Sequence, residues 1–187
     1  MGDDPTVANY DPEKRKGLKA SYFRIKSKEV LHVNNLYKMM HEWFVEQEYC
    51  EENEEFPETY YREKRIGGVR RMYVLWRCRK EPEYNPFYTR QMDVLIKCEH
   101  IKDIEVMQGG KKFKTNVGEV EIKCWSFMEV DTRREWRKHW FLKHFLDIYW
   151  QRIFYRDFEV HRQEVIRDTD DLRATVKQFL NLMQYKE

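Results

Sequence analysis

The stretch "GEVEIKCWSFMEV", residues 118 to 130, alternates between two kinds of side chain along its whole length. Every second residue is apolar or small, and these residues are Val120, Ile122, Cys124, Ser126, Met128 and Val130. Most of the residues between them are charged, although Trp125 and Phe127 are exceptions. Such strict alternation indicates a β-strand with one face buried. The stretch therefore predicts a strand that covers a core.

Two earlier stretches repeat this pattern. The inward positions are Met72, Val74, Trp76 and Cys78 in "RRMYVLWRCRK" (residues 70 to 80), and Met92, Val94, Ile96 and Cys98 in "YTRQMDVLIKCE" (residues 88 to 99). Between them and the opening stretch, "IKDIEVMQGGKKFKTN" predicts a hairpin that turns at Gly109 and Gly110. Residues 69 to 130 are therefore expected to form an antiparallel β-meander of about four to five strands.

Helical spacing appears on both sides of this meander. Val33, Tyr37, Met40 and Phe44 recur every three or four residues and predict a helix over residues 27 to 49, with Ser27 as its cap. After the meander, helices are expected over residues 132 to 185. A capping box supports the start of this region, and a heptad-like seam supports its end. The box is Thr132 with Glu135, and the seam is Leu172, Val176, Phe179 and Met183, with Asp168 or Thr169 capping the last helix.

These elements predict an α+β fold. It consists of an N-terminal helix, the meander, and long C-terminal helices packed on one sheet face. Residues 1 to 26 are polar, and residues 14 to 28 hold seven basic residues and no acid. We therefore expect residues 1 to 26 to be a basic N-terminal arm, and residues 27 to 187 to be a single α+β domain.

The segment between the meander and the C-terminal seam carries an unusual number of rings. On a helical wheel, residues 136 to 160 would present two apolar faces. The first is expected to cover the sheet and consists of Leu142, Phe145, Leu146, Tyr149, Ile153 and Val160. The second needs another cover, either the C-terminal helix folded back or a partner subunit, and consists of Trp136, Trp140, Trp150, Phe154 and Phe158. A helix that lies on a membrane is a third alternative, which the charges spread around the wheel disfavour. This second face is the predicted partner interface.

Three thiols share the inward face of the predicted sheet. Cys78, Cys98 and Cys124 each follow an apolar residue and a base, in "WRC", "IKC" and "IKC". Zinc sites favour cysteine pairs two to four residues apart, and no such pair occurs in the sequence. Cysteine behaves as a small buried hydrophobic residue when it is not a ligand. We therefore expect no metal site and three buried, reduced thiols.

The functional prediction is a structural or assembly protein without enzymatic activity. The sequence holds no catalytic motif and no cofactor or metal motif, so no catalytic residue and no cofactor is predicted. Charge falls in blocks: residues 46 to 58 hold seven Glu and no base, although the net charge is only +2. We expect the chain to be a subunit of a homo-oligomer, or to join another protein subunit in a larger particle. The start lacks the pattern of a signal peptide and no apolar run reaches the length of a membrane span, so the expected place is the cytoplasm or an assembled particle.

The alternative is a module that binds RNA or single-stranded DNA. Rings interleaved with bases on a sheet stack and hold single strands. The predicted contacts are Lys14, Arg15 and Lys16 in the arm, and Arg71, Tyr73, Arg77 and Trp125 on the outer sheet face. Acids on that same face weaken this alternative, because phosphate binders show a clear surplus of bases. These acids are Asp93, Glu99, Glu119, Glu121 and Glu129.

Overall fold

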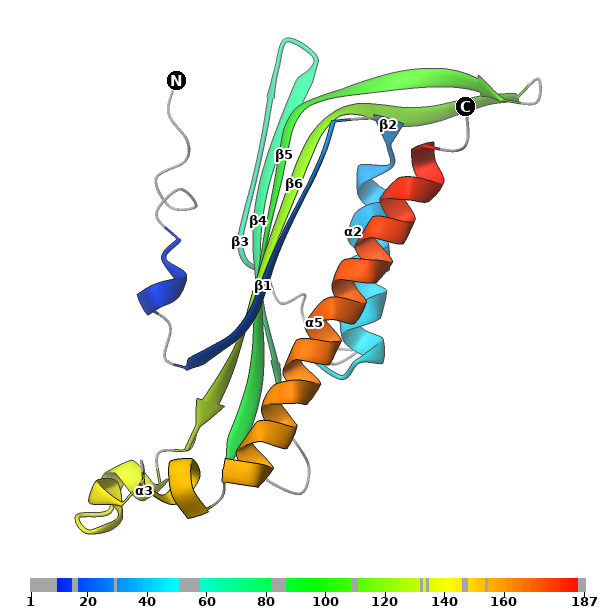
Figure 1. Cartoon of the computed structure of the whole chain (residues 1–187). Coiled ribbons are helices and arrows are strands. Elements are labelled where there is room, and N and C mark those ends of the chain that lie inside the picture. The colour runs from blue at the N-terminus through cyan, green and yellow to red at the C-terminus, as the bar shows by residue number, and fades with distance from the viewer. Residues whose placement is uncertain are drawn as a thin grey trace.

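An antiparallel sheet that curves around two helices makes up most of the described chain (Figure 1). The computed structural model describes residues 10–14, 17–28, 30–50, 58–81, 87–108, 111–131, 133, 135–145, 148–153 and 155–184. Both long helices, α2 (Val33–Glu46) and α5 (Tyr155–Gln184), lie on the same side of the sheet (Figure 1). The predicted α+β class, antiparallel sheet and long C-terminal helix are confirmed.

The strands follow the order β1-β6-β5-β4-β3 across the sheet. Their bounds are β1 (Leu18–Ser27), β3 (Glu58–Ile66), β4 (Val69–Lys80), β5 (Tyr88–Gln108) and β6 (Lys111–Val130), and the short β2 (Val30–Leu31) also pairs with β6. The first and last strands of the sequence are therefore neighbours. Phe23 of β1 stands opposite Cys124 of β6, and Ile25 stands opposite Ile122.

The meander has fewer and longer strands than the sequence suggested. The predicted strand over residues 88 to 99 and the first half of the predicted hairpin form one strand, β5, and the opening stretch is the second half of β6. The pairing shifts between Glu99 and Lys102, where the β5–β6 hairpin bends away from the rest of the sheet (Figure 1). Gly118 allows β5 and β6 to approach closely at this bend, because a Cβ atom there would lie only 2.5 Å from Cδ1 of Ile101. The predicted turn at Gly109 and Gly110 lies outside the described residues.

The core lies between the sheet and the two helices. All the predicted inward residues of β4 and β5, together with Val120, Ile122 and Cys124 of β6, are buried in one cluster. Helix α2 adds Leu36, Met40, Trp43 and Phe44, and helix α5 adds Leu172, Val176 and Leu180. The predicted inward face and the seam at Leu172 and Val176 are confirmed, whereas the side chain of Met183 lies outside the described residues.

The start of the chain differs from the prediction, because a strand precedes the first helix. Residues 18 to 26, expected in a polar arm, belong to β1, and Ser27 ends this strand instead of capping a helix. Phe23 and Ile25 fill the edge of the core. Arg24 and Lys26, on either side of Ile25, face outward, and Lys26 pairs with Glu119. Helix α2 begins later, with His32 as its N-cap residue.

The segment after the sheet also differs from the prediction, because it is not one continuous helix. Residues 135 to 153 form three short helical pieces, α3 (Glu135–Lys138), η2 (Leu142–His144) and η3 (Tyr149–Ile153). Helix α5 then runs unbroken through Asp168 and Thr169, which cap nothing. Thr132 of the predicted capping box lies outside the described residues. A helical wheel over residues 136 to 160 therefore does not describe which side chains share a face.

Candidate functional site

A buried polar cluster ties α5 to the sheet. The Tyr49 hydroxyl donates to Oδ2 of Asp168 at 2.8 Å, and Nη1 of Arg90 lies 3.8 Å from the same carboxylate oxygen. Arg90 also donates to Glu164, one turn earlier on the helix. Burial raises the pKa of Tyr49 well above its usual value, and the nearby Asp168 raises it further. The hydroxyl therefore stays protonated as a donor, and the cluster fastens the helix to the strand.

Two groups near this cluster are buried without a hydrogen-bond partner among the described residues. They are the Tyr88 hydroxyl and Nε of Arg90. The ring of Tyr88 packs on His161 at 5.1 Å and on Phe158 at 6.1 Å. Both carboxylates of the cluster already accept from Arg90 or Tyr49, so neither is an unpaired general base.

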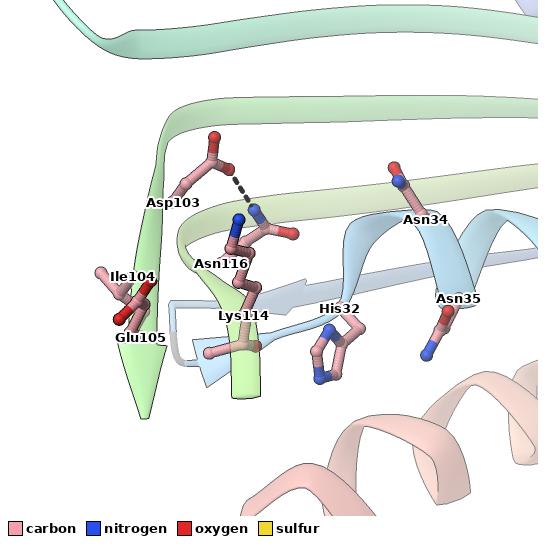
Figure 2. A pocket seen from close by; sticks show the side chains of 9 residues that line it. His32, Asn34, Asn35, Asp103, Ile104, Glu105, Lys114 and Asn116 are labelled. Carbon is pink, nitrogen blue, oxygen red and sulfur yellow. Dashed lines mark hydrogen bonds between the residues drawn. The ribbon is translucent and has the colours of Figure 1, made fainter. Parts of the chain in front are cut away.

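A polar pocket of about 470 Å³ lies between the bent β5–β6 hairpin and the start of α2 (Figure 2). His32 and Asn35 line it from the helix, and Asp103, Glu105 and Lys114 line it from the hairpin. The side chain of Asn116 donates to Asp103 at 2.6 Å. Two acids and one Lys stand together here, so the pocket carries only one surplus negative charge. Within the ranges that the structure describes, no group of three or more His, Cys, Asp or Glu is placed to hold a metal ion.

The outer sheet face, which points away from the helices, is covered by rings. Leu75, Leu95, Trp125 and Phe127 form a second buried cluster on this face, and Tyr10, Tyr60 and Tyr73 pack against it. The Tyr10 ring lies 5.0 Å from the Trp125 ring, and its hydroxyl donates to the fully buried Asp93. Tyr10 therefore covers Trp125 and Asp93 on this face.

The predicted nucleic-acid contacts are mostly engaged within the chain. Trp125 is only 8% exposed, the Tyr73 hydroxyl donates to Glu99 at 2.8 Å, and Nε of Arg77 lies 3.9 Å from Asp93. Arg71 is half-buried in β4. Of the three predicted contacts in the arm, Arg15 and Lys16 lie outside the described residues, as does the side chain of Lys14.

The acids of the outer face are neutralised by neighbouring strands. Lys26 and Lys28 both pair with Glu119, and their hydrogen bonds lower the pKa of its carboxyl group. Arg24 of β1 and Lys123 of β6 both pair with Glu121. Bases that pair with acids across strands stabilise the sheet, and they are less available to phosphates.

Residues 135 to 155 are called the aromatic end below, and the described part of this segment projects from one end of the sheet (Figure 1). The segment is anchored by stacked rings: Trp136 lies 4.2 Å from Tyr149, and Phe87 lies 5.6 Å from each of them. Other large apolar side chains of the segment face solvent. They are Trp140 at 76% exposure, Ile153 at 66%, Tyr155 at 57%, Phe141 at 49%, Ile148 at 48% and Phe145 at 44%.

The structure separates the three residues of the predicted interface whose side chains it describes. Trp140 is exposed, but Trp136 is half-buried in the anchor, and Phe158 is only 6% exposed because it packs on Tyr88. Phe158 thus belongs to the packing of the fold itself. Phe154 and the side chain of Trp150 lie outside the described residues.

The wheel also misplaced the residues that were expected on the sheet. Phe145, Ile153 and Val160 are exposed, and helix α5 covers the sheet with other residues. The sequence does hold one signal for this outcome. Basic residues recur through residues 133 to 156, and chain segments that pack on both sides rarely carry so many charges.

The described helices include none that is both long and apolar enough to cross a membrane. No protein-family model matches the chain, and no curated protein matches its sequence.

Proposed function

We propose that this chain is a structural protein without enzymatic activity that joins a homo-oligomer or a larger particle by docking its aromatic end. The observation that carries this proposal is the exposure of six large apolar side chains on one projecting segment. Exposed apolar patches of this kind mark interaction sites, because rings in water gain free energy when a partner covers them.

The rest of the molecule supports this choice of site. Both sheet faces are already covered, the inner face by the two helices and the outer face by Tyr10 and its neighbouring rings. The polar pocket at the start of α2 holds two acids against one Lys and has no catalytic constellation among its lining residues. The aromatic end is therefore the surface with the largest amount of uncovered apolar side chain among the described residues.

Binding of RNA or single-stranded DNA by the sheet face has less support. A stacking platform needs rings whose faces are open to bases. Tyr10 and Tyr22 both contact the Trp125 ring, at 5.0 and 5.4 Å. The acids of this face also pair with its bases. Light scattering with absorbance recorded at 260 nm would detect any nucleic acid that co-purifies with the protein. Its presence would count against the assembly proposal.

The test of the assembly proposal is a double substitution, Trp140→Ala with Phe141→Ala. The substitution should reduce self-association, which light scattering measures. It should also reduce co-sedimentation with the isolated particle, where one is found. The melting temperature should not change, because both rings face solvent. Phe113→Ala is the control, since Phe113 on the β5–β6 hairpin is a ring about as exposed as Phe141. Equal association of all three proteins would contradict the proposal.

A further inference from the structure

The aromatic end is basic on balance as well as apolar. Residues 135 to 155 hold four Lys or Arg and two acids, a surplus of two positive charges in a chain whose net charge is +2. The rest of the chain is therefore neutral on balance, and the surplus charge is local to this end. A docking partner that complements it carries negative charge.

Three of these bases are not paired within the described part of the fold. Arg137 donates to the carbonyl oxygen of Val130 at 3.3 Å, but Lys138, Lys143 and Arg152 are exposed and have no acidic partner among the described residues. This contrasts with the outer sheet face, where bases pair with acids across strands. The unpaired bases alternate in sequence with the exposed Trp140, Phe141 and Ile153, so each apolar group has a cation close by.

The surplus charge disfavours a second copy of the chain as the partner of this surface. A two-fold interface brings the same patch of both subunits together. Two aromatic ends would then face each other with two surplus positive charges each, and like charges placed opposite one another disfavour association. The cores of protein interfaces are also depleted in Lys, whereas this segment holds Lys138 and Lys143.

The arrangement of the rings disfavours a nucleic acid. Trp140 and Phe141 are tilted by 57° with centroids 5.7 Å apart, and Phe141 and Phe145 are tilted by 41° at 4.8 Å. Successive bases stack in parallel, so tilted rings that already contact each other make a poor platform. The exposed Ile148 and Ile153 have neither a ring nor a hydrogen-bonding group with which to contact a nucleobase.

We propose that the surface on which the aromatic end docks is a lipid bilayer rich in anionic lipids. This inference rests on the proposed function, because it names the surface of the larger particle. Trp and Tyr favour the level of the headgroups, and Phe and Ile side chains reach the acyl boundary below it. Lys and Arg beside them meet anionic headgroups, each contributing about fivefold in affinity.

The fold presents this end to a flat surface. The aromatic end projects past the sheet, on the opposite side of the molecule from the β5–β6 hairpin (Figure 1). The anchor of Phe87, Trp136 and Tyr149 holds it on the body, while Trp140 and Phe145 are exposed to solvent. Its contact with a bilayer is peripheral, through side chains that are already exposed.

The experiment is sedimentation of the full chain with vesicles of phosphatidylcholine alone or of phosphatidylcholine with phosphatidylserine. The wild type should bind the vesicles that contain phosphatidylserine, release them at high salt, and show a blue shift of Trp fluorescence. Replacing Lys138, Lys143 and Arg152 by Gln should weaken binding roughly 100-fold. Trp140→Ala with Phe141→Ala should weaken it by a similar factor, and Phe113→Ala should leave it unchanged.

The outcomes separate this inference from the proposed function. Failure of the wild type to bind phosphatidylserine vesicles overturns the inference, as does equal binding of the wild type and the charge variant. If the ring variant loses self-association and the wild type does not bind vesicles, the proposed function holds and the lipid inference is wrong. If the ring variant changes neither association nor vesicle binding, both are wrong. Binding of a single-stranded oligonucleotide that needs Trp140 also overturns the inference.

Discussion

The thiol of Cys98 gives the clearest residue-level prediction about pH. Burial raises the pKa of this thiol from 9.0 to about 12, so the folded chain keeps a proton that the unfolded chain loses. The free energy of unfolding should therefore fall as pH rises from about 9 to 12. Cys98→Ala should flatten this fall, which denaturant titrations at several alkaline pH values would measure. An identical slope in both proteins would mean that Cys98 does not contribute.

A second residue-level prediction concerns Tyr10, which holds the chain before β1 against the outer sheet face. Its hydroxyl donates to Asp93, whose side chain is fully buried. Tyr10→Phe keeps the ring on Trp125 but removes this donor from a buried carboxylate, so it should lower the free energy of unfolding by about 1 to 3 kcal/mol.

Tyr22→Phe is the control for this change, because Tyr22 also contacts Trp125 while its ring is 42% exposed. The control should leave the free energy of unfolding unchanged in urea titrations. Equal stability of the Tyr10 variant and the wild type would show that the hydroxyl bond adds nothing.

At the scale of elements, helix α5 offers a matched pair of positions. Leu172 is fully buried against the sheet and α2, whereas Val160, three turns earlier, is 52% exposed. Leu172→Ala should lower the free energy of unfolding by about 2 to 5 kcal/mol, because it leaves a cavity. Val160→Ala should change it by less than about 0.5 kcal/mol. Thermal melts of both variants test this, and a similar loss in both would place α5 differently on the sheet.

The inward faces of the strands were predictable because burial imposes a period of two on the sequence. Met72 to Cys78 and Met92 to Cys98 place an apolar residue or Cys at every second position, although Leu75 and Leu95 stand between them, and every inward residue of these runs is buried. Strand β1 escaped prediction because only Phe23 and Ile25 face the core, among bases that the sequence suggested were solvated. Those bases instead pair with acids of β6, a partner about a hundred residues away.

The aromatic end was predictable as a source of partners but not in its shape. A helical wheel assumes continuous helical hydrogen bonding, and no Gly or Pro warns of a break. In the structure, Nδ1 of His139 accepts from the backbone amides of Phe141 and Leu142, which ends the regular helix there. A side chain that competes for backbone amides leaves little trace in hydrophobic periodicity. The exposed set of rings therefore differs from the predicted one.

At the scale of the whole molecule, two truncations separate the covering segment from the sheet. Removing residues 1 to 16 takes away Tyr10 but keeps β1, so the chain should fold with a modestly lower melting temperature. Removing residues 1 to 26 deletes almost all of β1, including Phe23 and Ile25 from the core, and should prevent stable folding. Circular dichroism and melting curves distinguish the two. A stable fold after the longer deletion would mean that β1 is dispensable.

The pairing of β1 with β6 also affects folding during synthesis. Leu18 is opposite Met128 and Ser27 is opposite Val120, so the edge strand emerges from the ribosome long before its neighbour exists. Until then, Phe23 and Ile25 have no sheet to join, and helix α5, which completes the core, is made last of all. Native contacts between such distant segments form slowly, because the intervening chain must first be closed into a loop. A nascent chain of this protein therefore exposes apolar, unpaired strands for most of its translation. We expect aggregation, and protection by chaperones, to matter most during this interval.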